Sequence, residues 1–225
     1  LPGKRLDQIR AAPINDGFSP TSVDAALQPA QYADLPALSA KPAGNNLEGL
    51  LYPDSFQKSA DTNPSVIVRE SLTEMGDKLT PSLQAAFASE GLTTYQGITL
   101  ASIVQQEVAK PADQTQAAQV FLSRLKIGMP LGSDVTAFYG AILAGHAPST
   151  SYDSPYNTLL HTGLPPTPIS TVSAGSLNAV AHPATTNWLY FVTGDDGTTY
   201  FEQTAEQHQA DVDQYCHTLC TQDSQ

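Results

Sequence analysis

Proline and glycine divide much of this chain into short helical segments, and this punctuation constrains the fold more than any other feature of the sequence. Pro64 directly follows Asn63, the pairing expected where a helix begins. The apolar face of that helix comprises Val68, Leu72, Met75 and Leu79. Thr80 and Pro81 begin a second helix, which Gly91 ends. Similar signals continue along the chain and make helix the main element of the predicted fold.

Further helices follow with the same boundary signals. We expect them at Leu6–Ala11, at Thr99–Lys110 before Pro111, from a capping box of Asp113 and Gln116 to Gly128, and at Ser173–Ala181. Thr204 and Gln207 open a last helix, whose stripe contains Ala205, His208, Val212, Tyr215 and Leu219. On that helix Cys216 and Cys220 are one turn apart, where a disulfide would strain the geometry. We therefore expect neither cysteine to be essential.

Two strands are indicated near the C-terminal end. Trp188–Thr193 and Thr198–Gln203 flank Gly-Asp-Asp-Gly, which predicts a hairpin. The stretch Leu131–Thr171 has no long period, and long irregular stretches inside a domain often build active sites. The predicted fold class is therefore α+β, a helical core with β-hairpins.

The first 46 residues differ from the rest of the chain. They are rich in Pro, Ala, Asp and Gln and carry little periodicity. The aromatic and turn residues of LEGLLYPDSF, from Leu47 onward, mark a change to ordered structure. We expect a small N-terminal segment at 1–46 and a second domain at 47–225.

The charge of the chain disfavours several kinds of partner. Ten Lys and Arg stand against 22 Asp and Glu, a net charge of −12, and Lys126 is the last basic residue. Phosphate recognition needs cationic side chains, so this balance argues against nucleic acids and anionic membrane surfaces. A neutral polymer recognised by hydroxyls, amides and aromatic faces fits better. The sequence has no signal peptide and no apolar run long enough to span a bilayer, and it begins at Leu1 as a mature fragment would.

One acidic residue lies on the apolar face of a predicted helix. Leu100, Ile103, Val104 and Val108 form that face, and Glu107 falls at about 340° when Leu100 is taken as zero. Burial disfavours the charged form of a carboxyl group and raises its pKa, which suits a general acid near neutral pH. Arg124 lies similarly on the face of the next helix. The alternative interpretation is a structural ion pair between Glu107 and Arg124.

Other kinds of catalytic site find less support. The sequence has no HExxH or similar metal-spaced cluster and no G-x-S-x-G elbow, so we expect no metal and no serine nucleophile. His208 lies on the stripe of the last helix and is interpreted as a core histidine.

Several motifs resemble those of a known family, in the family's order. LASIVQQE resembles L-A-S-I-V-E-K-E, VFLSRLKIGMPLGSDVTAFYG resembles V-F-x-N-R-L-x-x-G-M-x-L-Q-S-D-P-T-V-x-Y, and SPYNTLLHTGLPPTPIS resembles S-P-Y-N-T-Y-x-x-x-G-L-P-P-G-P-I. LEGLLYPDSF, AHPATTNWLYFV and TAEQHQADV also match family segments. Over about residues 47–215 the chain thus resembles the YceG-like family, the endolytic murein transglycosylases called MltG. LPGKRLDQI weakly resembles the start of that family's LysM-like segment, and this resemblance implies that residues 1–46 are a LysM-like segment truncated at its start.

The resemblance implies a role for each matching residue. Glu107 falls on the catalytic glutamate, and Arg124 supports the site without touching sugar. The substrate-binding residues are expected to be Ser133, Asp134, Tyr139, Tyr156 and Asn157. Asp134 is also expected to hold the SDVT loop. The chain departs from the family pattern at Gln105, Gln106, Gly132, Val135 and Thr167, where Glu, Lys, Gln, Pro and Gly are common.

The activity that the resemblance implies is lytic cleavage of peptidoglycan glycan strands, between N-acetylmuramic acid and N-acetylglucosamine, without a cofactor. Glu107 would protonate the leaving oxygen and then accept the proton of the C6 hydroxyl, which closes on C1 and forms a 1,6-anhydro end. The expected setting is extracytoplasmic, with a membrane anchor N-terminal to Leu1 and peptidoglycan synthases as partners. The alternatives are an inactive peptidoglycan-binding scaffold module and a hydrolase with two carboxylates.

Overall fold

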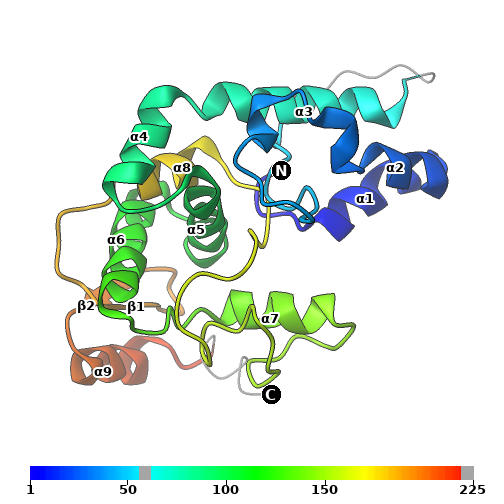
Figure 1. Ribbon diagram of the computed structural model, residues 1–225. Coiled ribbons are helices and arrows are strands. Elements are labelled where there is room, and N and C mark those ends of the chain that lie inside the picture. Colours follow the sequence, from blue (N-terminus) through cyan, green and yellow to red (C-terminus); the bar gives the residue numbers. More distant parts are fainter. Residues whose placement is uncertain (56–61, 219–225) are drawn as a thin grey trace. The chain divides into compact units, whose positions relative to one another are not determined.

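The computed structural model describes residues 1–55 and 62–218 (Figure 1). The chain forms two compact units, Leu1–Gln105 with Thr167–Leu177 and Gln106–Pro166 with Asn178–Gln225. Helices dominate both units, and a two-stranded antiparallel sheet completes the second. The predicted α+β class is therefore confirmed. Residues 1–46 lie inside the first unit, and their separation from 47–225 as a LysM-like segment stays a prediction.

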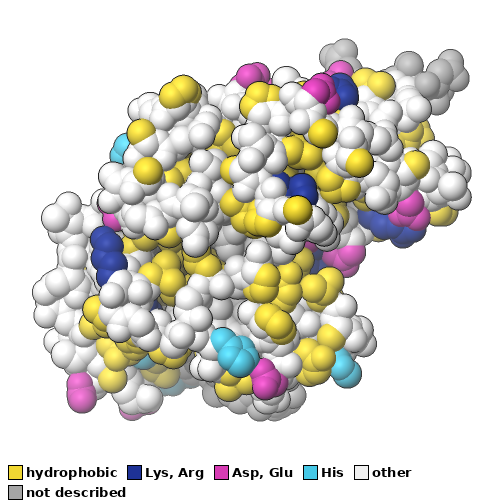
Figure 2. Space-filling model, in the orientation of Figure 1, with side chains coloured by type: hydrophobic (Ala, Val, Ile, Leu, Met, Phe, Trp, Pro, Cys, Tyr) yellow, Lys and Arg dark blue, Asp and Glu magenta, His cyan; other side chains and the backbone are white. Residues whose placement is uncertain are grey.

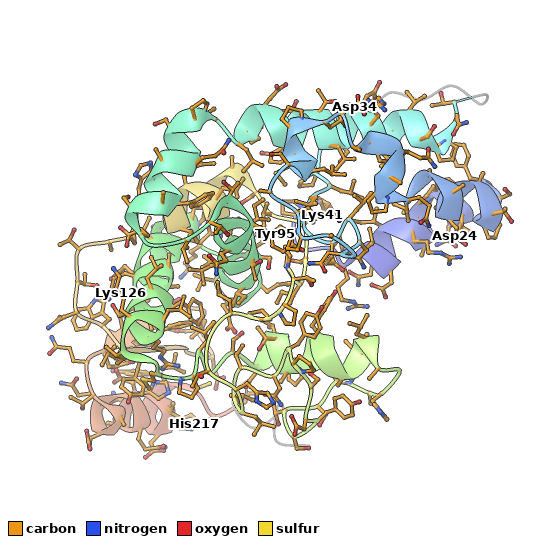
Figure 3. The ribbon with its side chains drawn as sticks, viewed as in Figure 1. Asp24, Asp34, Lys41, Tyr95, Lys126 and His217 are labelled. Carbon is orange, nitrogen blue, oxygen red and sulfur yellow. The ribbon has the colours of Figure 1, made fainter. Side chains whose placement is uncertain are left out.

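The first 46 residues contain more helix than the sequence indicated. Helix α1 (Leu6–Asn15) continues past the predicted end at Ala11 and includes Pro13, and α2 (Pro20–Ala26) was not predicted. Two short 3-10 helices follow, η1 (Pro29–Tyr32) and η2 (Pro36–Leu38). The Arg10 guanidinium donates to the Asp24 carboxylate at 2.8 Å and so links α1 to α2; Asp24 is labelled in Figure 3.

Partly buried hydrogen bonds join the N-terminal stretch to Glu48 and Tyr95 of the first unit. Both carboxylate oxygens of Glu48, which is 3% exposed, accept the Leu6 amide at 3.0 Å. The Asn45 side chain donates to the Tyr95 hydroxyl at 3.1 Å, and Lys41 donates to the Asn45 carbonyl at 2.6 Å. Lys41 and Tyr95 are both labelled in Figure 3. Residues 1–46 thus contact Glu48 and Tyr95 within the first unit.

The next two helices begin where their caps predict. Helix α3 (Pro64–Lys78) starts after Asn63, whose side chain accepts the Ser65 amide at 3.0 Å. Helix α4 (Pro81–Ser89) starts after Thr80, whose hydroxyl accepts the Leu83 amide at 3.2 Å. The predicted apolar face of α3 is buried, with Leu72 and Met75 fully inaccessible. Both helices are confirmed.

Helix α5 (Thr94–Glu107) is shifted relative to the predicted range Thr99–Lys110. It starts earlier because Thr93 and Gln96 form a reciprocal capping box, with hydrogen bonds of 3.2 and 2.9 Å. It ends earlier because Lys110 is already the N-cap of the next helix. Glu107 is therefore the last residue of α5.

The second unit contains one helix that was not predicted. Helix α6 (Pro111–Ile127) begins at Pro111, so Asp113 and Gln116 do not form its capping box, and Gly128 ends it with φ 69°. Helix α7 (Asp134–Leu143) lies within the stretch predicted to be irregular. Its sequence, DVTAFYGAIL, is almost continuously apolar, which hides the helical period.

The C-terminal elements follow the prediction closely. Helix α8 (Ala174–Ala181) follows Ser173, and strands β1 (Tyr190–Thr193) and β2 (Thr199–Glu202) pair antiparallel. Helix α9 (Ala205–Tyr215) begins with the predicted capping box of Thr204 and Gln207.

The last helix is shorter than predicted, which changes the geometry expected for the cysteines. Because α9 ends at Tyr215, Cys216 lies outside it, at the C-cap position. Cys216 is disulfide-bonded, so the expectation that helical geometry prevents a bridge is wrong. Cys220 and Leu219 lie outside the described residues, and whether the cysteines are dispensable stays a prediction.

The surface carries few cations on the face drawn in Figure 2, where Lys and Arg side chains are scattered among polar and hydrophobic groups. In the described ranges, 1–55 and 62–218, no helix is both long enough and apolar enough to cross a membrane.

Candidate active site

The residues expected in the site all lie in the second unit, between positions 107 and 157. Glu107 is the last residue of α5. Its neighbours Val104 and Val108 are buried, as the periodicity predicts, but Glu107 itself is only partly buried. Because the helix ends at this residue, no further helical turn covers the carboxyl group. An acid in this position touches the core and keeps some exposed surface.

Ser133 is a direct partner of Glu107. Its hydroxyl donates to Glu107 Oε1 at 2.6 Å, and the serine is 1% exposed. Ser133 occupies the N-cap position of α7, where a serine side chain usually accepts a hydrogen bond from the helix backbone. Here the side chain makes no such cap. The Ser133 hydroxyl instead donates its hydrogen bond to the carboxyl group of Glu107.

Asp134 follows Ser133 as the first residue of α7. The sequence placed it in a loop that it would hold by local hydrogen bonds; the segment is instead the start of a helix. A carboxylate in the first turn interacts favourably with the helix dipole. Asp134 therefore lies next to Ser133, the partner of Glu107. A contact between Asp134 and substrate stays a prediction.

Arg124 joins two segments of the second unit through their backbones. Its Nε donates to the Leu189 carbonyl at 2.7 Å, and its Nη1 donates to the Leu131 carbonyl at 2.6 Å. The guanidinium carbon lies 5.1 Å from the centre of the Tyr190 ring. Arg124 thus bonds to backbone carbonyl groups on both segments, and one of these carbonyls lies two residues before Ser133.

The charge of Arg124 still acts on its surroundings. Burial lowers the pKa of its guanidinium, while Tyr190 and then Glu107 act in the opposite direction. Glu107 and Arg124 therefore interact through their charges. The hydrogen bonds of the Arg124 guanidinium are made to the carbonyls of Leu189 and Leu131. The supporting role of Arg124 stays a prediction.

Gly132 leaves room for the Arg124 guanidinium. Its φ of 68° is in the left-handed region that favours glycine. A Cβ at this position would lie 2.6 Å from Arg124 Nη1. The family pattern commonly has Gln here, and in this chain the arginine fills the space next to the backbone.

Tyr139 and Tyr156 form a pair. Their ring centres are 4.9 Å apart with the planes tilted by 58°. Tyr139 is 5% exposed, and Tyr156 is partly exposed. Gly140 allows this approach, because a Cβ there would overlap the Ser154 hydroxyl and lie 3.0 Å from Tyr156 Cβ. Of the two rings, Tyr156 has more surface for a sugar to contact.

Asn157 is placed differently from the expectation. It is 0% exposed, and its amide nitrogen donates to the Thr150 and Tyr152 carbonyls at 2.9 and 2.8 Å. Its side-chain oxygen accepts the Leu159 amide at 3.0 Å. With the amide engaged inside its own loop, Asn157 positions the segment that carries Tyr156. A direct sugar contact for Asn157 has no support in this geometry.

Two threonines near Ser133 were missed by the sequence reasoning. Thr136 and Thr158 are 0% and 2% exposed, and their hydroxyl oxygens lie 2.7 Å apart. Both belong to segments that resemble family motifs, and this was the only sequence signal that could have indicated them.

A second group of titratable residues lies between β2 and α9. Burial, helped by Asp211, raises the pKa of Glu202 to about 8. His208 Nδ1 is 3.4 Å from Glu202 Oε2, and its ring stacks on Tyr190 at 5.5 Å. Burial and the charge of Arg124 lower the pKa of His208, while Asp211 acts in the opposite direction. His208 thus packs against Tyr190, but its side chain is 31% exposed, so it is not the fully buried core histidine that the stripe predicted.

Among residues 1–55 and 62–218, no three His, Cys, Asp or Glu side chains gather in a way that could hold a metal ion. The groups that the site offers are a carboxyl group, hydroxyls, aromatic rings and a guanidinium. These are suited to proton transfer and to recognition of sugar hydroxyls.

Comparison with known proteins places most of the chain in one family. The sequence model of the YceG-like family matches residues 3–214. The endolytic murein transglycosylase of Bacillus subtilis is 31% identical over 175 residues, which are 75% of this chain and 48% of that protein. The endolytic murein transglycosylase of Streptococcus pneumoniae strain D39 is 30% identical over 195 residues, 82% of this chain and 35% of that protein. The chain thus spans half or less of the length of these relatives.

A solved structure agrees with the sequence comparison. The crystal structure of a yceG-like protein from Listeria monocytogenes superposes with a TM-score of 0.79 at 26% identity. The match covers 93% of this chain and 74% of that one.

Proposed function

Since this chain belongs to the YceG-like family, we propose that it is an endolytic peptidoglycan transglycosylase. Its substrate is the glycan strand, cut between N-acetylmuramic acid and N-acetylglucosamine. The observation that carries the proposal is the 2.6 Å hydrogen bond from the Ser133 hydroxyl to the carboxyl group of Glu107. It joins two motifs that are 26 residues apart in sequence around one partly buried acid.

Glu107 acts first as an acid and then as a base. Its proton passes to the glycosidic oxygen as the bond from that oxygen to C1 of N-acetylmuramic acid breaks. The C6 hydroxyl of the same sugar then bonds to C1 and gives its proton to the Glu107 carboxylate. The product is a 1,6-anhydro sugar, no water is consumed, and Glu107 returns to its acid form. One carboxyl group is sufficient because no water has to be activated.

The surrounding residues support these two proton transfers. Ser133 binds the Glu107 carboxyl group, and the Arg124 cation nearby stabilises its negative charge between the two steps. Tyr156 offers a partly exposed ring for the apolar face of a sugar. Asp134 and Tyr139 are the other residues proposed to bind the substrate.

The proposed setting follows from the substrate. Peptidoglycan lies outside the cytoplasmic membrane, so the protein works there, held by an anchor N-terminal to Leu1. Peptidoglycan synthases are the proposed protein partners, because a cut strand must be coordinated with strand synthesis.

The test is digestion of purified sacculi, with mass spectrometry of the soluble products. The parent protein is expected to release 1,6-anhydro muropeptides, and Glu107→Gln should release at least 100-fold less while keeping its melting temperature. Glu70→Gln, the same change at an exposed position of α3, is the matched control and should behave as the parent. If the parent pellets with sacculi and releases nothing, the protein is a binding scaffold. Reducing ends without anhydro sugar would instead indicate a hydrolase.

A further inference from the structure

The backbone of Ser133 is held at both its N–H and its C=O by two buried threonines. The Ser133 amide donates to Thr158 Oγ1 at 3.2 Å. The Thr136 hydroxyl donates to the Ser133 carbonyl at 2.6 Å. The two threonine hydroxyls are 2.7 Å apart, which closes a ring of hydrogen bonds that starts and ends at Ser133. We call this set of bonds the threonine ring.

The direction of each bond in the threonine ring follows from counting protons. A hydroxyl has one hydrogen to donate, and Thr136 uses its hydrogen on the Ser133 carbonyl. The bond between the threonines must therefore run from the Thr158 hydroxyl to Thr136 Oγ1. Thr158 Oγ1 keeps its lone pairs for the Ser133 amide. Every donor in the ring has one acceptor, so the arrangement has a single polarity.

Burial makes this ring difficult to replace with water. Ser133, Thr136 and Thr158 are 1%, 0% and 2% exposed. A buried polar group that loses its partner pays the full cost of desolvation, so each member favours the conformation that satisfies the others. The backbone bond from the Gly132 amide to the Thr158 carbonyl, 2.9 Å long, adds a further tie between the same segments.

The only part of Ser133 outside the ring is its side chain, and that side chain binds Glu107. We propose that Thr136 and Thr158 are positioning residues, which hold Ser133 so that its hydroxyl orients the Glu107 carboxyl group for both proton transfers. This inference rests on the proposed function. It explains why the N-cap serine of α7 gives up its usual bond to the helix.

The chemical consequence concerns the acid. A hydroxyl that donates to a carboxylate favours its charged form. A Ser133 that is not held in place would favour that form less, so Glu107 would keep its proton to higher pH. The alkaline limb of the pH–activity profile, where the acid form of the enzyme is lost, should then move to higher pH.

The test compares Thr158→Val, which removes the hydroxyl and keeps the shape, with Thr158→Ser, which keeps the hydroxyl. Thr158→Val is expected to lower anhydro-product release per folded molecule by about 10- to 100-fold and to move the alkaline limb to higher pH, and Ser133→Ala should do the same. Thr158→Ser should restore the parent's limb, and Thr136→Val should behave as Thr158→Val. Thr99→Val is the matched control, because Thr99 is 2% exposed and bonds only within α5.

Each outcome decides between explanations. If Thr158→Val keeps the parent's pH profile and loses activity only in proportion to unfolding, the threonine ring is structural and the inference is wrong. If Thr99→Val moves the limb equally, the effect is general and the inference also fails. Glu107→Gln, assayed in parallel, separates the two levels: its retention of activity would overturn the proposed function itself, whereas its inactivity beside an unshifted Thr158→Val profile overturns only the inference.

Discussion

Asn157→Ala is expected to affect stability before it affects chemistry. The side chain is fully buried and makes three hydrogen bonds, to the carbonyls of Thr150 and Tyr152 and from the amide of Leu159. A typical hydrogen bond contributes about 1 kcal/mol net, so removal of all three should cost about 3 kcal/mol. For a chain of this size each kcal/mol corresponds to about 2–4 °C, which predicts a fall in melting temperature of about 6–12 °C.

The measurement is thermal and urea unfolding, followed by circular dichroism and compared with product release per folded molecule. Asn187→Ala is the matched control, since Asn187 is exposed and its side-chain oxygen accepts one bond from Gln203. A stability change below about 1 kcal/mol together with a large loss of turnover would refute this reasoning and return Asn157 to the sugar-binding residues.

Two other changes test the packing and the charges of the molecule. Gly140→Ala should destabilise the protein by about 1–3 kcal/mol, because the added Cβ would overlap the Ser154 hydroxyl. Gly76→Ala, also inside a helix, should stabilise it by about 0.5–1 kcal/mol, because a Cβ there would lie 3.7 Å from its nearest neighbouring atom. Equal melting temperatures for the two variants would contradict the packing described for α7. Glu202 has a folded-state pKa of about 8, above its ordinary value of 4.5, so the native state binds this proton more tightly and stability should fall as pH rises from about 4.5 to about 8. Glu202→Gln should remove that fall and melt several degrees above the parent at pH 8 but not at pH 4, as melting curves across this range would reveal; an unchanged pH dependence would contradict it.

The elements that the sequence predicted well have their signals close together. The caps at Asn63 and Thr80, the end of α6 at Gly128 and the hairpin before Thr204 each depend on a few adjacent residues. Local signals of this kind survive in the folded chain because the bonds they describe form within one turn. Helix α7 escaped prediction because its residues are apolar on almost every side.

The partners of the site residues could not be predicted in the same way. The sequence placed Glu107 and Arg124 on apolar faces, and the structure shows that Arg124 bonds to the carbonyls of Leu131 and Leu189. Backbone carbonyls are identical at every position, so no pattern of side chains indicates which of them an arginine will reach. Asn157 poses the same difficulty, because an amide suited to a sugar is equally suited to its own loop.

The space that Arg124 occupies beside Gly132 limits how this protein can evolve. Any side chain at position 132 would place its Cβ 2.6 Å from Arg124 Nη1. The backbone φ at this position also favours glycine. A lineage in which Gln stood at this position would have to move the arginine before, or together with, the gain of the side chain. The two positions are therefore expected to change as a pair, and a single substitution at 132 transplanted from a relative should be tolerated poorly in this background. The order in which these two positions are substituted is therefore expected to matter as much as the residues that they gain.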